Sequence, residues 1–182
     1  MLPPDAIKDI QKNADLLYDK HQIETALSNI AHQINSQLND KNPLVMCVIN
    51  GGIITAGHLL PKLNFPLTLD SIHVSRYGHN THGDSLHWLA KPQSSLTDRT
   101  VLLVDDILDE GITLDEIAHF CRKQGAKEIF SAVLIDKQLN KPKPITADFI
   151  ALTSPNRYLF GYGMDYQGYL RNAPGIFACQ HN

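Results

Sequence analysis

The sequence predicts one α/β domain with a parallel-rich central sheet and helices on both faces. Three observations support this prediction. The length of 182 residues suits a single domain with a sizeable core. Apolar runs without alternation, typical of strands buried on both faces, occupy 44–49, 101–104 and 128–135. Segments with apolar residues at helical spacing separate these runs, so strands and helices alternate along the chain.

Composition and charge exclude several classes of protein. A net charge of −3 with 43% hydrophobic residues describes a globular protein without the basic excess of a nucleic-acid binder. No run approaches the ~18 apolar residues of a membrane span, and residues 1–13 lack the pattern of an export signal. The three cysteines, Cys47, Cys121 and Cys179, form no CxxC pair. We therefore expect a cytoplasmic protein with reduced thiols and neither nucleic-acid nor membrane partners.

The N-terminal region has helical spacing from Pro3 to Leu38. We expect two helices here, broken near 18–22, with Asp5 capping the first. The apolar run Leu44–Ile49 follows and predicts a central strand.

The glycine pair after this strand has two interpretations. Asn50, Gly51 and Gly52 could form a tight hairpin turn that needs no ligand. The segment 53–60 has helical rather than strand spacing, which favours a unit of strand, glycine turn and helix.

Two further strands are expected at 67–74 and 86–90, joined by a long polar connection. Histidines 73, 79, 82 and 87 fall in this region and raise the possibility of a transition-metal site. No cysteine accompanies them and no HExxH spacing occurs, so a solvated loop is the favoured interpretation.

The stretch from Val101 to Leu114 carries the most specific chemistry. Its strand, 101–104, is expected to end before Asp105 and Asp106, which places both carboxylates where open α/β sheets bind ligands. The alternative is an acidic turn before a helix, with solvated carboxylates and no ligand. However, the backbone N–H groups of 110–113 and the Thr113 hydroxyl can surround a phosphate. The two carboxylates can accept hydrogen bonds from ribose hydroxyls or from Mg²⁺-bound water.

Beyond this stretch, the strand 128–135 delivers Asp136 and Lys137 to its carboxyl end. A lysine there is usually a solvated surface residue. Residues 141–147 are expected to form a connecting loop and 149–152 a short strand. The aromatic-rich segment 157–172, RYLFGYGMDYQGYLRN, could simply pack on the core.

The stretch VLLVDDILDEGITL resembles the phosphoribosyl-pyrophosphate binding motif of the type I phosphoribosyltransferases. From about Leu44 to Arg171 the chain is similar to bacterial hypoxanthine-guanine phosphoribosyltransferases. The resemblance implies the type I phosphoribosyltransferase fold in a single domain, with a core of about 40–140 and a small hood from 1–20 and 141–182. It implies purine salvage with Mg²⁺, in which hypoxanthine or guanine and phosphoribosyl pyrophosphate give IMP or GMP and pyrophosphate. It also leads us to expect a homodimer or homotetramer.

The resemblance further assigns roles to individual residues. Asp109 would act as the catalytic acid/base toward purine N7, and Lys137 would donate to the exocyclic oxygen of a 6-oxopurine. Tyr158 would stack on the base and Leu159 would offer it a backbone carbonyl. Asp165 would organise a second Mg²⁺. The remaining assignments are ribose to Asp105 and Asp106, which could also hold Mg²⁺ through water; the 5′-phosphate to Asp109, Glu110, Gly111, Ile112 and Thr113; pyrophosphate to Asn50, Gly51 and Arg171; and a mobile loop of about 75–85 that begins with Ser75, Arg76 and Tyr77.

Two residues depart from the family pattern. Asn50 stands where a lysine is often found, which removes a formal charge from the pyrophosphate loop. Glu110 stands where threonine or serine is often found, so we expect its side chain to point away while backbone donors bind the phosphate.

Two other functions remain as alternatives. A non-catalytic regulator could sense phosphoribosyl pyrophosphate on the same fold, although it would need a nucleic-acid surface or an added DNA-binding domain. A phosphoacceptor signalling domain also combines an acidic pair, a threonine and a lysine. Its acidic pair follows the first strand, whereas Asp105 and Asp106 lie past mid-chain.

Overall fold

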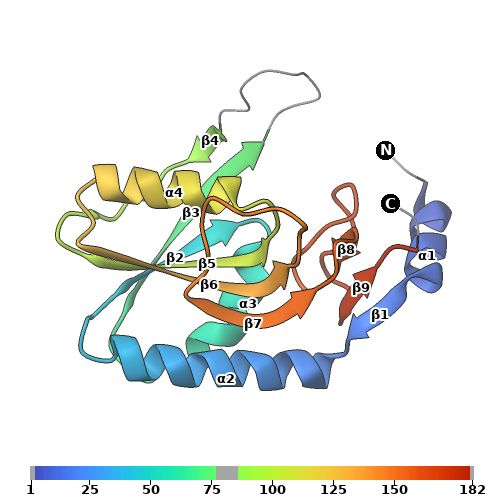
Figure 1. The fold of residues 1–182 in the computed structure, drawn as a ribbon, viewed down its shortest axis with the longest axis horizontal. Coiled ribbons are helices and arrows are strands. Elements are labelled where there is room, and N and C mark those ends of the chain that lie inside the picture. Colours follow the sequence, from blue (N-terminus) through green and yellow to red (C-terminus); the bar gives the residue numbers. More distant parts are fainter. Residues whose placement is uncertain (1–2, 77–85, 181–182) are drawn as a thin grey trace.

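The computed structural model describes residues 3–76 and 86–180 and contains a large sheet with helices on both faces (Figure 1). The strand order is β4-β3-β2-β5-β6-β7. Neighbouring strands run parallel except for β3 and β4. The predicted α/β fold with a parallel-rich central sheet is therefore confirmed. The strands are β2 (Leu44–Ile49), β3 (Thr68–Arg76), β4 (Leu86–Ala90), β5 (Thr100–Leu108), β6 (Glu128–Lys137) and β7 (Phe149–Ser154).

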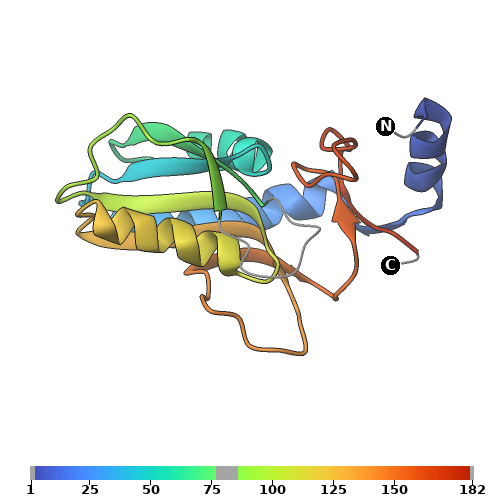
Figure 2. The ribbon, with the colours of Figure 1, turned by 90° about the horizontal axis from the view of Figure 1, so that it is seen from above.

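Helices α2 (Lys20–Leu38) and α3 (Gly52–Leu59) cover one face of this sheet, and α4 (Ile112–Lys123) covers the other (Figures 1 and 2). A short 3-10 turn, η1 (Leu60–Lys62), follows α3. Successive residues of a strand point to opposite faces, so β2 contributes to both cores, which explains its unalternating apolar sequence. Within the described ranges, none of the helices is long and apolar enough to cross a membrane.

Strand β5 is longer than the sequence predicted. Its pairing with β6 continues to the partners Leu108 and Asp136. Asp105 and Asp106 therefore lie inside the strand rather than past its end. The predicted end was wrong because carboxylates are rare in buried strands, which favoured an end before Asp105. In the structure β5 stays hydrogen-bonded to the long strand β6 beyond both carboxylates.

The N-terminal region contains the two expected helices, α1 (Pro4–Asn13) and α2. The break between them is a strand, β1 (Asp15–Tyr18), which its sequence pattern did not predict. Asp5 does not cap α1, which has no side-chain cap; Asp5 lies in the first turn and pairs with Lys8. Asp19 instead caps α2, accepting from the N–H of Gln22 at 2.8 Å.

Strand β1 belongs to a second, three-stranded sheet in the order β1-β9-β8, where β8 is Leu159–Phe160 and β9 is Ile176–Ala178. Strand β9 was also missed. Figures 1 and 2 place this small sheet beside the large one and next to α1. The aromatic segment 157–172 contributes Phe160 to a core that Ile10 of α1 contacts. Segments from both ends of the chain thus build one layer beside the large sheet.

Candidate active site

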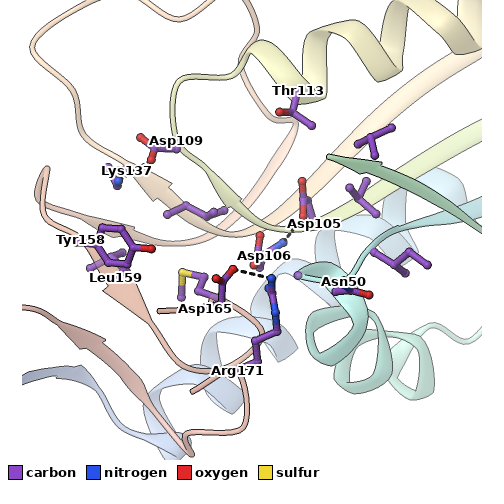
Figure 3. A pocket seen from close by; sticks show the side chains of 16 residues that line it. Asn50, Asp105, Asp106, Asp109, Thr113, Lys137, Tyr158, Leu159, Asp165 and Arg171 are labelled. Atoms are coloured by element: carbon purple, nitrogen blue, oxygen red, sulfur yellow. Dashed lines mark hydrogen bonds and ion pairs between the residues drawn. The ribbon is translucent and has the colours of Figure 1, made fainter. Parts of the chain in front are cut away.

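A cavity of about 380 Å³ contains many of the predicted site residues (Figure 3). The large sheet supplies the ends of β2, β5 and β6, and the segment 158–171 supplies the opposite wall. Val48, Ile49, Val74, Ile107 and Met164 complete the lining and were not predicted. The predicted residues gathered here are Asn50, Gly51, Asp105, Asp106, Asp109, Thr113, Lys137, Tyr158, Leu159, Asp165 and Arg171.

A second cavity of about 200 Å³ is formed by residues 105–114. Glu110, Gly111 and Ile112 line it together with Thr113, which also lines the first cavity. Gly111 has φ of +83°, a left-handed conformation that glycine adopts without strain, and helix α4 begins directly after it. The first N–H groups of a helix have no partner within the helix and attract anions. This geometry suits a phosphate group.

Asp105 and Asp106 form a buried acidic pair, with 9% and 7% exposure. Burial raises the pKa of Asp105 well above its ordinary value, and the neighbouring charge of Asp106 raises it further. Burial also raises the pKa of Asp106, although hydrogen bonding to Asp105 and the charge of Arg171 oppose that rise. The N–H of Asp106 donates to Oδ1 of Asp105 at 2.8 Å. Two crowded carboxylates in a dry site would be stabilised by hydroxyl donors or by a cation.

Lys137 and Asp109 are paired across the end of the large sheet. Lys137 Nζ lies 2.6 Å from Oδ2 of Asp109 (Figure 3). The preceding residues, Asp136 and Leu108, are register partners in β6 and β5. The register therefore brings the two side chains together. Lys137 is buried. Lys137 is therefore not a solvated surface lysine, and its role toward a base stays a prediction.

The opposite wall is ordered by Asp165 and Arg171. Arg171 Nη2 lies 2.5 Å from Oδ1 of Asp165, and its Nη1 donates to the carbonyl of Gly163 at 2.6 Å. The second carboxylate oxygen of Asp165 accepts from the N–H of Gly168 at 2.7 Å. Tyr158 is exposed, and its ring packs edge-on against Tyr166. Tyr158 also lines the cavity, where a planar ligand could reach its ring.

The two walls meet at Gly51. A Cβ atom on Gly51 would lie 2.2 Å from Oδ2 of Asp106, and a Cβ on Gly163 would lie 2.2 Å from the carbonyl of Gly51. Only glycine fits at these close approaches. Asn50 is exposed beside them and is joined to Ile49 by a cis peptide bond.

Two lysines next to residues 108–110 were missed, because 141–147 was predicted only as a connecting loop. Lys141 Nζ lies 2.6 Å from Oε1 of Glu110. Lys143 Nζ donates to the carbonyl of Leu108 and to Oδ1 of Asp136, both at 2.6 Å. The density of lysines in this loop was the signal in the sequence.

The structure describes only the start of the predicted mobile loop. Ser75 and the backbone of Arg76 end β3, whereas Tyr77 and the rest of 75–85 lie outside the described residues. His79 and His82 lie there as well. Among residues 3–76 and 86–180 no group of three or more His, Cys, Asp or Glu could hold a metal ion, so the described part gives no support to a histidine metal site.

Comparison with known proteins identifies the family. The phosphoribosyl transferase domain family matches residues 13–167. Hypoxanthine-guanine phosphoribosyltransferase of Bacillus subtilis is 30% identical over 169 residues, covering 92% of both proteins. The bifunctional protein TilS/HprT of Listeria innocua is also 30% identical over 92% of this chain, which spans 26% of that protein. The structure of hypoxanthine phosphoribosyltransferase from Trypanosoma cruzi with IMP superposes with a TM-score of 0.84 at 28% identity, covering 92% of this chain and 95% of that one. The chain therefore belongs to the phosphoribosyltransferase family of enzymes, in which hypoxanthine-guanine enzymes resemble it over most of their length.

Proposed function

We propose that this enzyme transfers the phosphoribosyl group of phosphoribosyl pyrophosphate to N9 of hypoxanthine or guanine. The products would be IMP or GMP and pyrophosphate, as in purine salvage. The observation that carries the proposal is the Lys137–Asp109 pair, 2.6 Å apart, beside the phosphate loop.

The pair matches one edge of a 6-oxopurine. Atoms O6 and N7 of such a base are neighbouring hydrogen-bond acceptors. Lys137 would donate to O6, and Asp109 would exchange a proton with N7 as N9 bonds to C1 of the ribose. Adenine presents an amino group in place of O6, which a lysine donor disfavours. The pair would thus select the base and assist the reaction.

The other residues would hold phosphoribosyl pyrophosphate and the base. The 5′-phosphate would lie in the loop 109–113, which lines the smaller cavity where helix α4 begins, and would accept from backbone N–H groups there. Asp105 and Asp106 would accept from the ribose hydroxyls. Pyrophosphate would contact Asn50, Gly51 and Arg171. Tyr158 would stack on the purine, and Leu159 would bind it through its carbonyl.

We also propose that the reaction uses Mg²⁺. Mg²⁺ usually keeps several waters and takes one or two carboxylates together with substrate phosphates, which agrees with a site that has few protein ligands. Asp165 would hold one ion, and Asp105 and Asp106 could contact another through water. Asp165 would have to share its oxygens with Arg171 and Gly168, which it contacts now. The bound metal would stabilise the charge that develops on the departing pyrophosphate.

An assay of nucleotide formation tests the proposal. The protein is mixed with phosphoribosyl pyrophosphate, Mg²⁺ and one base at a time, and products are separated by chromatography. We expect IMP from hypoxanthine and GMP from guanine, no AMP from adenine, and no product with excess EDTA. Binding of phosphoribosyl pyrophosphate without nucleotide from any base would instead support the non-catalytic regulator.

We further propose that the chain forms a homodimer or homotetramer. Ile53 and Leu69 are large apolar side chains that are half exposed or more, at 50% and 56%. They line a mainly apolar groove of about 380 Å³. Exposed apolar patches of this kind often mark protein interfaces. Light scattering after size-exclusion chromatography would give the mass, and a monomer at all concentrations would contradict the proposal.

We propose that the protein is cytoplasmic because its cysteines are free thiols. Cys47, Cys121 and Cys179 are free and buried, as expected in a reducing compartment. Cell fractionation with an antibody would test this, and recovery outside the cytoplasm would contradict it.

A further inference from the structure

We propose that Lys143 is a positioning residue that holds Asp109 and Lys137 in register for proton exchange with the purine. This inference rests on the proposed function, in which these two side chains handle the base. It assigns a role to a loop for which the sequence predicted none.

The ammonium of Lys143 fastens the two strand ends that carry the pair. Its Nζ donates at 2.6 Å to the carbonyl of Leu108 and at 2.6 Å to Oδ1 of Asp136. Leu108 directly precedes Asp109, and Asp136 directly precedes Lys137. Leu108 and Asp136 are opposite each other in β5 and β6. The Lys143 side chain therefore joins the two strands one residue before the Lys137–Asp109 pair.

Residues 143–145 also lie close to the same loop after Asp109, at Gly111. A Cβ atom on Gly111 would lie 3.4 Å from Cβ of Lys143 and 3.3 Å from Cδ of Pro144. Residues 143–145 therefore lie on the side of Gly111 where a Cβ atom would project. Lys143 thus donates to the residue before Asp109 and lies near Gly111, two residues after it.

Burial distinguishes Lys143 from its neighbour in the loop. The side chains of Lys143 and Asp136 are 12% and 18% exposed, whereas those of Lys141 and Glu110 are 60% and 40% exposed. A shielded ion pair holds its geometry better than a solvated one. Asp136 also accepts from Nε2 of Gln138 at 2.8 Å. It therefore keeps one partner when Lys143 is replaced, which favours a folded variant.

Replacing the ammonium while keeping the stem tests the role. Lys143→Met removes the two hydrogen bonds but keeps an unbranched apolar stem at this position. Small misplacements of a reacting group can cost about 10²-fold in rate, so we expect kcat to fall by about 10- to 100-fold while KM for phosphoribosyl pyrophosphate changes little. Lys143→Arg should restore most of kcat because it can still bridge both oxygens.

Lys41→Met is the matched control. Lys41 Nζ lies 2.9 Å from Oε2 of Glu128, the first residue of β6, so this variant breaks a lysine–carboxylate bridge at the opposite end of the same strand. Thermal stability should fall in both methionine variants, but kcat should fall only in Lys143→Met. An equal fall in kcat in both would overturn the proposal.

A double-mutant cycle with Asp109→Asn asks whether Lys143 acts through Asp109. If it does, adding Lys143→Met to Asp109→Asn should lower kcat by no more than about twofold, which is the usual scatter of such cycles. A full additional loss in the Asp109→Asn background would show that Lys143 does not act through Asp109 and would overturn its role in proton exchange.

A measurement on the unliganded protein separates this inference from the proposed function. The ¹³C signal of the Asp109 carboxyl and the ¹⁵N signal of the Lys137 ammonium should move in Lys143→Met and stay in place in Lys41→Met. Unchanged signals in Lys143→Met would overturn the role of Lys143 even in an active enzyme. A wild type that forms no nucleotide would overturn the proposed function, while these signals still decide the positioning role.

Discussion

Lys137 Nζ and Oδ2 of Asp109 lie 2.6 Å apart, at the ends of neighbouring parallel strands (Figure 3). The lysine is buried, whereas the aspartate side chain is 46% exposed toward the cavity. A cationic donor and a carboxylate at hydrogen-bond distance can bind neighbouring atoms of one ligand edge. This relationship links the choice of base to the proton exchange that accompanies transfer.

Replacing Asp109 with asparagine should lower the rate while preserving binding. The amide cannot exchange a proton with N7, so we expect kcat to fall by about 10²–10⁴-fold with a modest change in nucleotide affinity. Steady-state kinetics and equilibrium binding of IMP would measure both effects. A near-normal kcat would rule out the acid/base role of Asp109.

Lys137→Ala should remove most activity with hypoxanthine and guanine. The base loses a charge-assisted donor, which is worth about 1.5–3 kcal/mol, or roughly 10- to 150-fold in kcat/KM. Lys123→Ala, at an exposed position in α4, is the control and should behave as wild type. Use of adenine as readily as hypoxanthine by the wild-type enzyme would show that Lys137 does not set selectivity.

Glu110→Thr should preserve activity and tighten phosphoribosyl pyrophosphate binding slightly. The change removes a negative charge from the phosphate loop and frees Lys141, which now pairs with Glu110 at 2.6 Å. Exposed ion pairs contribute about 0–1 kcal/mol, so folding should be nearly unaffected. KM for phosphoribosyl pyrophosphate, measured for Glu110→Thr and the wild type at low and high salt, would isolate the effect of the charge. A large loss of activity would reveal a different role for Glu110.

Asp105→Asn should stabilise the protein at neutral pH and weaken substrate binding. Burial, with the adjacent Asp106, raises the pKa of Asp105, so the folded state favours the protonated form. The stabilisation that Asp105 contributes is fully present below its pKa in the unfolded chain, near 3.8. It is lost as the pH rises through the higher pKa of Asp105 in the folded protein.

The neutral amide avoids that loss. At pH 7 we expect a higher Tm for Asp105→Asn than for the wild type, with a difference that shrinks as the pH falls toward 3.8. KM for phosphoribosyl pyrophosphate should rise because a ribose-binding carboxylate is lost. Exposed Asp9→Asn is the control. A lower Tm for Asp105→Asn at pH 7 would contradict the prediction.

Gly51→Ala should impair substrate binding, because its methyl group would lie 2.2 Å from Oδ2 of Asp106 and would displace that carboxylate. We expect KM for phosphoribosyl pyrophosphate to rise by about tenfold or more, in line with the cost of misplaced binding groups. Gly57→Ala in α3 is the matched control, since no described atom outside the adjacent helix backbone lies within 4 Å of its added Cβ. That change should stabilise the helix by about 0.5–1 kcal/mol without altering KM. Equal kinetics for the two variants would refute the steric argument.

Much of the large sheet was predictable from local pattern. The apolar runs at 44–49, 101–104 and 128–135 became β2, β5 and β6, because strands covered on both faces need apolar residues throughout. The phosphoribosyltransferase family was predictable from 101–114 and is confirmed by the comparisons. Strands β1 and β9 were not predictable, because short strands have little periodicity and their pairing partners are distant in sequence.

The sequence by itself determined that a buried strand leads into an acidic pair, a glycine turn and a helix, because these features depend on residues close together in the chain. Only the tertiary structure decided that Asp105 and Asp106 lie inside β5, that Lys137 meets Asp109 and that Lys143 fastens both strand ends. These contacts depend on the register between β5 and β6 and on the return of the loop 141–147 across their ends. Packing of the whole sheet sets that register, and no local pattern in the sequence encodes it.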